Sequence, residues 1–154
     1  MQGKPIAIAT LVAGTLDIAS AILLTLLGGK SVMAMLQGVA SGPFGAWPRA
    51  NDWLGAAAGL AVHFAITAVM AGVFAALAPR LPWLRERWLV YGIGYGMLLY
   101  LVMYWIVLPL RFAGAGGASA GLGGILIPLA IHILLVGIPI ARILGKSSAP
   151  RSPE

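Results

Sequence analysis

Three ionisable side chains interrupt long apolar stretches of this sequence: Asp17, His63 and His132. At about 1.5 Å per helical residue, each lies about 15–16 Å from the start of its stretch. A bilayer has a hydrocarbon core about 30 Å thick, so all three reach its midplane. A charged side chain at that depth costs about 2.5–3.5 kcal/mol on insertion scales unless a partner stabilises it. We therefore predict that Asp17 faces the interior of a helix bundle and contacts His63, His132 or both.

Such a cluster has three interpretations. A buried Asp–His contact can serve only to fix the packing of helices. It can also form the proton-handling or substrate site of a carrier or channel, since ionisable groups inside membranes are functional candidates. The third interpretation is a metal or haem held by His63 and His132, with Gly59 one turn away leaving room for a flat ring. Two histidines are few for that purpose and no cytochrome motif is present, so we expect no cofactor and no metal site.

Other polar residues could support this cluster. Thr67 follows His63 by one helical turn, and Tyr95 and Tyr100 lie deep enough in the third apolar stretch to need hydrogen-bond partners. Packing is the favoured role for both tyrosines. In the first stretch, Gly14 lies near Asp17 on a stripe of small and polar residues, which suits close contact between helices.

Catalytic chemistry finds little support in the sequence. The absence of cysteine excludes thiolate catalysis, and no Ser–His–acid arrangement is present. Residues 29–31 and 145–147 end like phosphate-binding loops, but Leu24 and Ile140 replace the upstream glycines that such loops require. We therefore expect no catalytic residues and no enzyme activity.

The elements that must position the cluster are membrane-spanning helices. Of the 154 residues, 60% are hydrophobic and only 9% are charged, and the mean hydropathy is +0.97. The apolar stretches are too long for barrel strands, which leaves helices as the way to satisfy every backbone group in lipid. The prediction is an all-α polytopic four-helix transmembrane bundle with spans at about 6–27, 53–78, 88–108 and 122–144.

Several ends of the predicted spans are marked by residues that cap or end helices. Asn51 and Asp52 are expected to cap the second span, and Pro79 and Pro109 to end the second and third. A short surface helix is expected at 31–39. The transmembrane domain then covers 1–145, and a polar, disordered cytoplasmic tail covers 146–154.

Orientation follows from the basic residues, because positive charge accumulates on the cytoplasmic side of membrane proteins. One side would carry seven of them: Lys4, Arg80, Arg85, Arg87, Arg142, Lys146 and Arg151. The other would carry three: Lys30, Arg49 and Arg111. Both termini are therefore predicted to be cytoplasmic. Because the basic residues flank the spans, the net charge of +6 indicates contact with lipid headgroups and no nucleic-acid partner.

Some segments resemble a family of bacterial inner-membrane proteins related to YagU. The similar positions are 63–64, 81–84, 95–96, Met103, 107–110, His132 and 136–141. They are spread over roughly half of the chain, between positions 63 and 141, and none is a catalytic signature. The resemblance implies a bacterial inner-membrane location and a four-helix body, and it brings no reaction with it.

The sequence thus predicts a small, non-enzymatic inner-membrane protein, an accessory subunit or membrane-integrity factor with a buried Asp–His contact. The alternative is a proton-coupled carrier or channel-like protein that uses Asp17, His63 and His132. Its partners would be the lipid bilayer and either further copies of itself or other membrane subunits, because so short a chain encloses a pathway poorly on its own.

Overall fold

Four long apolar helices make up most of the computed structural model, which describes residues 3–116 and 121–147. The first is α1 (Gly3–Leu27) and the second is α3 (Asp52–Leu77). The third is built from α4 (Trp88–Leu101), a π-helical turn (Val102–Val107) and α5 (Leu108–Arg111). The fourth joins α6 (Gly121–Ile131), a π-helical turn (His132–Gly137) and α7 (Ile138–Ser147). All four are long and apolar enough to cross a membrane, as predicted.

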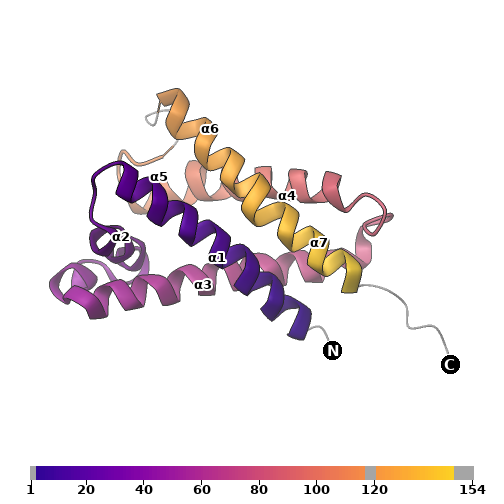
Figure 1. The fold of residues 1–154 in the computed structure, drawn as a ribbon, viewed down its shortest axis with the longest axis horizontal. Coiled ribbons are helices and arrows are strands. Elements are labelled where there is room, and N and C mark those ends of the chain that lie inside the picture. The colour runs from indigo at the N-terminus through magenta and orange to yellow at the C-terminus, as the bar shows by residue number, and fades with distance from the viewer. Residues whose placement is uncertain (1–2, 117–120, 148–154) are drawn as a thin grey trace.

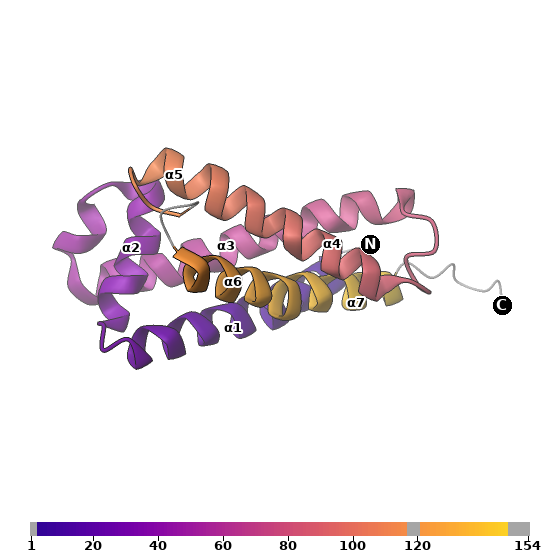
Figure 2. The ribbon, with the colours of Figure 1, turned by 90° about the horizontal axis from the view of Figure 1, so that it is seen from above.

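The helices form a bundle in which α1 and the α6–α7 helix run diagonally across α3 and α4 (Figure 1). α1 packs against α3 and α7, and α7 packs against α4. α3 and α4 meet through Tyr95, whose hydroxyl donates to the Met70 carbonyl at 2.6 Å and whose ring meets Phe74 edge-on. The start of α1, the end of α7 and the α3–α4 connection share one end of the bundle, while α2 occupies the other (Figure 2).

Glycines allow the third and fourth helices to approach closely. A Cβ atom on Gly96 would meet the backbone of His132 and Ile133 at 2.5 Å, and one on Gly92 would meet Ile138 at 2.8 Å. Gly94 faces open space, so it takes no part in this contact. Spacing of small residues by four therefore brings two backbones together here, as it does in many membrane helix pairs.

A fifth helix, α2 (Val32–Phe44), covers one end of the bundle and is longer than the surface helix expected at 31–39. The Ser31 side chain caps it by accepting a hydrogen bond from the Ala34 amide at 3.2 Å. α2 packs against α3 so tightly that a Cβ atom on Gly59 would overlap the Leu36 carbonyl. This packing fixes α2 to the second long helix.

Two boundary predictions were wrong. The Asn51 side chain donates to the Trp47 carbonyl at 2.8 Å and makes no capping bond to α3. Pro109 does not end the third helix, which continues to Arg111. The π-helical turn ends two residues before Pro109, and its wider turn accommodates a residue that has no amide hydrogen. Pro79 behaves as predicted, because α3 gives way to a short 3₁₀ turn at Ala78–Arg80.

The outer surface of the bundle is apolar. Large side chains are well exposed on each long helix, among them Leu11 (60%), Val69 (65%), Val90 (66%) and Leu126 (52%). Exposed apolar surface on this scale is rare in water-soluble monomers and is normal for helices that face lipid. Of the predicted tail, Lys146 and Ser147 belong to α7, and residues 148–154 lie outside the described part of the chain.

Candidate functional site

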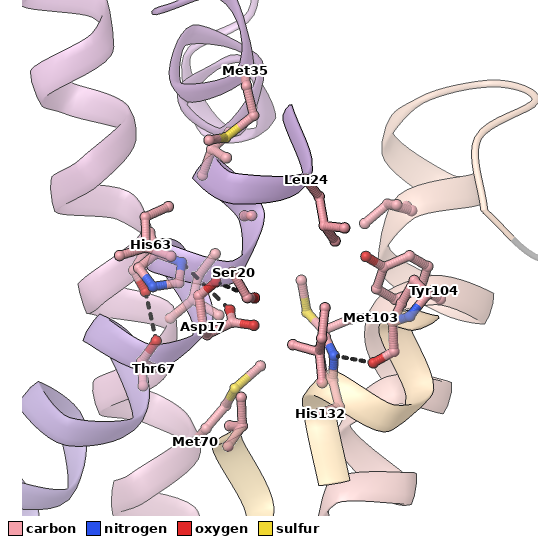
Figure 3. Close-up of a pocket in the computed structure, with 18 residues that line it drawn as sticks. Asp17, Ser20, Leu24, Met35, His63, Thr67, Met70, Met103, Tyr104 and His132 are labelled. Carbon is pink, nitrogen blue, oxygen red and sulfur yellow. Dashed lines mark hydrogen bonds and ion pairs between the residues drawn. The ribbon is translucent and has the colours of Figure 1, made fainter. Parts of the chain in front are cut away.

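A cavity of about 310 Å³ lies inside the bundle, between its middle and the end covered by α2. All four long helices and α2 contribute to its wall (Figure 3). Its polar lining residues are Asp17, Ser20, His63, Thr67, Tyr104 and His132. The three midplane residues predicted from the sequence therefore line the same cavity.

Asp17 and His63 lie together on one wall of the cavity. The Oδ2 atom of Asp17 is 3.9 Å from Nδ1 of His63, which is an ion-pair distance and too long for a direct hydrogen bond. The other ring nitrogen of His63, Nε2, lies 2.8 Å from the Gly14 carbonyl oxygen in α1. A carbonyl oxygen can only accept, so Nε2 carries the proton in this bond. His63 thereby links α3 to α1 and turns its Nδ1 atom toward the carboxylate.

Gly14 makes this link possible because it lets α1 approach α3. A Cβ atom at this position would lie 2.7 Å from the Phe64 ring. A quarter of the Asp17 side chain is exposed, compared with 12% of the His63 side chain. The carboxylate is consequently the more accessible member of the pair, and a proton or small ligand in the cavity can reach it.

His132 and Tyr104 form the opposite wall (Figure 3). His132 is buried, with 8% of its surface exposed, and its Nδ1 atom donates to the Pro128 carbonyl oxygen at 2.9 Å. The Tyr104 ring meets the His132 ring edge-on at 5.6 Å and stacks on Tyr100 at 5.1 Å.

The two π-helical turns place this second wall. Tyr104 lies in the turn Val102–Val107, and His132 begins the turn His132–Gly137. Each turn ends two residues before a proline, at Pro109 and Pro139. In both, the amide that follows the turn donates to the carbonyl five residues earlier. π-Helical turns are rare and frequently occur at functional sites, because they redirect side chains within a helix.

The supporting residues predicted from the sequence have different places. Thr67 lines the cavity, and its hydroxyl donates to the His63 carbonyl at 3.0 Å. Tyr100 contacts His132 edge-on at 6.2 Å from behind the cavity wall. Tyr95 packs between α3 and α4 and does not line the cavity.

Sequence reasoning did not select Ser20, Tyr104 or the methionines of the lining, Met35, Met70 and Met103. Ser20 and Tyr104 carried a weak signal. Ser20 follows Asp17 by three residues, which is nearly one helical turn, and Tyr104 precedes Pro109 by five, where a π-helical turn can form. For methionine there was no signal, because it is common throughout apolar helices.

Metal binding is not favoured by this geometry. Within residues 3–116 and 121–147, no three side chains of the His, Cys, Asp and Glu types lie close enough to share a metal ion. The cavity instead places one carboxylate and two imidazoles around a space that a ligand could occupy.

No protein-family model, curated protein or solved structure matches this chain.

Proposed function

We propose that this chain is a small, non-enzymatic, multi-pass protein of the bacterial inner membrane that takes up and releases a proton in its central cavity. In this proposal it acts as a proton-coupled carrier or channel-like protein, with both ends of the chain in the cytoplasm. The observation that carries the proposal is the placing of Asp17 beside His63 at the edge of the cavity.

The hydrogen bond to Gly14 explains why this pair would hold a proton. With Nε2 of His63 donating to that carbonyl, a neutral imidazole presents a lone pair on Nδ1. A lone pair facing an ionised carboxylate 3.9 Å away is repulsive. One proton on either Asp17 or Nδ1 removes the repulsion, so the pair is suited to hold one proton and to exchange it with the cavity.

The partial exposure of Asp17 supports a working site over a purely structural one. A contact that only fixed helix packing would gain most from a direct, dry hydrogen bond. Here the two atoms are separated by more than a hydrogen-bond length, and the carboxylate borders an open space. A water molecule or a ligand in this space could lie beside the two atoms and bond to both of them.

A structural or accessory role is the second candidate, and a different observation favours it. The bond from His63 to Gly14 ties α3 to α1 whether or not any proton moves. If this were the whole role of the site, Asp17 would serve to orient the imidazole, and the protein would act through its surface as a subunit or a membrane-integrity factor.

Proton flux into liposomes separates the two candidates. Purified protein in vesicles with an internal pH-sensitive dye should acidify the lumen under a pH gradient, and Asp17→Asn should abolish that flux. Asp52→Asn is the matched control, since it removes one acid at the exposed start of α3 and should leave the flux unchanged. Equal flux in the parent, in Asp17→Asn and in empty vesicles, with all proteins folded, would contradict the proposal and leave the structural role.

A further inference from the structure

The two aliphatic hydroxyl groups of the cavity, those of Ser20 and Thr67, use their hydrogens in bonds to backbone carbonyls. Ser20 Oγ donates to the Asp17 carbonyl at 2.7 Å, and Thr67 Oγ1 donates to the His63 carbonyl at 3.0 Å. Each hydroxyl has one hydrogen to donate and two lone pairs. Both hydrogens are already used by the backbone, so these hydroxyls can only accept hydrogen bonds from a ligand.

The two imidazole rings also use their hydrogens in bonds to backbone carbonyls. His63 uses the hydrogen on Nε2 to bond the Gly14 carbonyl, and His132 uses the hydrogen on Nδ1 to bond the Pro128 carbonyl. In a neutral imidazole the second nitrogen is an acceptor. Nδ1 of His63 and Nε2 of His132 are therefore acceptors whenever these rings are neutral.

The remaining polar groups complete an acceptor-rich lining. The carboxylate of Asp17 accepts only, and among the lining residues the Tyr104 hydroxyl is the one group that still has a hydrogen to donate. Within the described ranges 3–116 and 121–147, no lysine or arginine lines the cavity, whereas Arg49 and Arg111 both line the neighbouring groove. Buried acceptors need donors, and when both imidazoles are neutral the Asp17 carboxylate has no positive charge beside it among the lining side chains.

We propose that the cavity binds a small protonated primary amine whose ammonium group donates to the Asp17 carboxylate and to Nδ1 of His63. The site is the one in the proposed function, and the inference names the class of its ligand. An ammonium group has three hydrogens to donate and no acceptor, which complements this lining.

The rest of the cavity suits a short alkyl chain. Three methionines line it together with aliphatic residues such as Ile18 and Val136. Methionine side chains are flexible and polarisable, so they adapt to ligands of different shapes. A volume of about 310 Å³ is at the small end of the range of about 300–1,000 Å³ for ligand pockets. The ligand should therefore be small.

If Asp17 and His63 hold one proton, as in the proposed function, amine binding would displace it. The proton and the ammonium ion each bring one positive charge to the same carboxylate, and a neutral His63 is needed for Nδ1 to accept. The balance is one ammonium ion bound and about one proton released. His132 faces the pair from the fourth helix and Tyr104 from the third, while α2 contributes the uncharged Met35 and Val39.

Titration calorimetry of the intact protein in mild detergent tests this inference, with n-butylammonium as the probe. Measurement in two buffers of different ionisation enthalpy should show about one proton released per ligand bound. n-Butyltrimethylammonium has the same chain and charge but no N–H group. It should bind about tenfold or more weakly, because the hydrogen bonds to charged and imine acceptors are lost. Butyrate, which carries the opposite charge, should not bind.

The outcomes distinguish this inference from the proposed function. Equal binding of the two cations, binding of butyrate, or no binding of n-butylammonium to folded protein would overturn the inference. Proton flux that depends on Asp17 would leave the proposed function standing in each case. Binding of n-butylammonium without proton release would support the amine site and contradict the proton-coupled function. Asp17→Asn should lose binding while keeping its thermal unfolding profile, and Asp52→Asn should keep both.

Discussion

Nδ1 of His63 lies 3.9 Å from Oδ2 of Asp17 while Nε2 of the same ring bonds the Gly14 carbonyl at 2.8 Å. The two nitrogens of one imidazole therefore have separate tasks. Nε2 holds α3 to α1, and Nδ1 faces the carboxylate and the cavity. This division predicts that structural and functional effects can be separated by mutation.

Asp17→Asn should change the free energy of unfolding by about 1 kcal/mol or less, because the ion pair is long and partly exposed. His63→Phe should cost more, about 1–2 kcal/mol, since it also removes the bond to the Gly14 carbonyl. Denaturant titration of both variants in the same detergent measures the difference. An equal or larger cost for Asp17→Asn would show that the carboxylate is mainly structural.

Gly96→Ala should disturb the cavity although Gly96 does not line it. The added methyl group would press on the backbone of His132 and Ile133 and should cost about 1–3 kcal/mol. Gly94→Ala is the matched control, because Gly94 has open space beside it and should be neutral or slightly stabilising. Thermal unfolding and n-butylammonium binding would both be measured. If Gly96→Ala changed neither the unfolding temperature nor amine binding, that result would contradict the close packing of the third and fourth helices.

Met103→Lys should mimic the proposed ligand. A lysine at this lining position carries an ammonium group on a flexible stem that can reach Asp17, so n-butylammonium should no longer bind. The double variant Met103→Lys with Asp17→Asn should be less stable than Met103→Lys alone, because the ammonium group loses its partner. Calorimetry and unfolding measurements on the two variants give the interaction energy between the introduced ammonium group and the Asp17 carboxylate. Unchanged amine binding by a folded Met103→Lys protein would place the ligand elsewhere.

Arg111→Gln should loosen the contact between α5 and α2. Arg111 donates through Nη2 to the Ser41 carbonyl at 2.8 Å and through Nε to the Gly42 carbonyl, at the end of α2. Because Arg111 is exposed, we expect a loss of about 1 kcal/mol. Arg49→Gln removes the same charge from the same groove and should have less effect. Hydrogen exchange of the α2 amides would show the difference, and equal protection in both variants would count against this anchor.

Topology can be tested with reporter fusions. A reporter that is active only in the cytoplasm should be active when fused after Glu154 and inactive when fused after Phe112, at the opposite end of the bundle. The reason is the excess of basic residues at the end where α1 begins and α7 ends. The reverse pattern would show that the chain is inserted the other way round.

The helices could be predicted from the sequence because apolar runs of this length have few other structures open to them. Asp17 could also be matched with the two histidines, since all three lie at the same depth, but the sequence did not choose between His63 and His132. What the sequence left open was rotation about the helix axes. Depth follows from counting residues, but the π-helical turns at Val102–Val107 and His132–Gly137 change the direction of the side chains beyond them.

For the same reason, Tyr104 was not recognised and the contact between Asp17 and His132 was not resolved. In the structure His132 lies across the cavity from Asp17 and gives its hydrogen to a carbonyl of its own helix. The excess of hydrogen-bond acceptors over donors in the cavity could not be predicted either. It depends on which backbone carbonyl each hydroxyl and ring nitrogen reaches.

Each π-helical turn also sets how far one half of its long helix is rotated, about the helix axis, relative to the other half. An α-helix rotates by about 100° per residue, so one additional residue in a turn shifts the phase of everything that follows by about that angle. Gly92 and Gly96 can therefore be placed for backbone contact at one end of the third helix, while Tyr104 is aimed independently into the cavity at the other. Removing a single residue from either turn would restore a uniform helix. The side chains on one side of the deletion would then no longer point in their present direction.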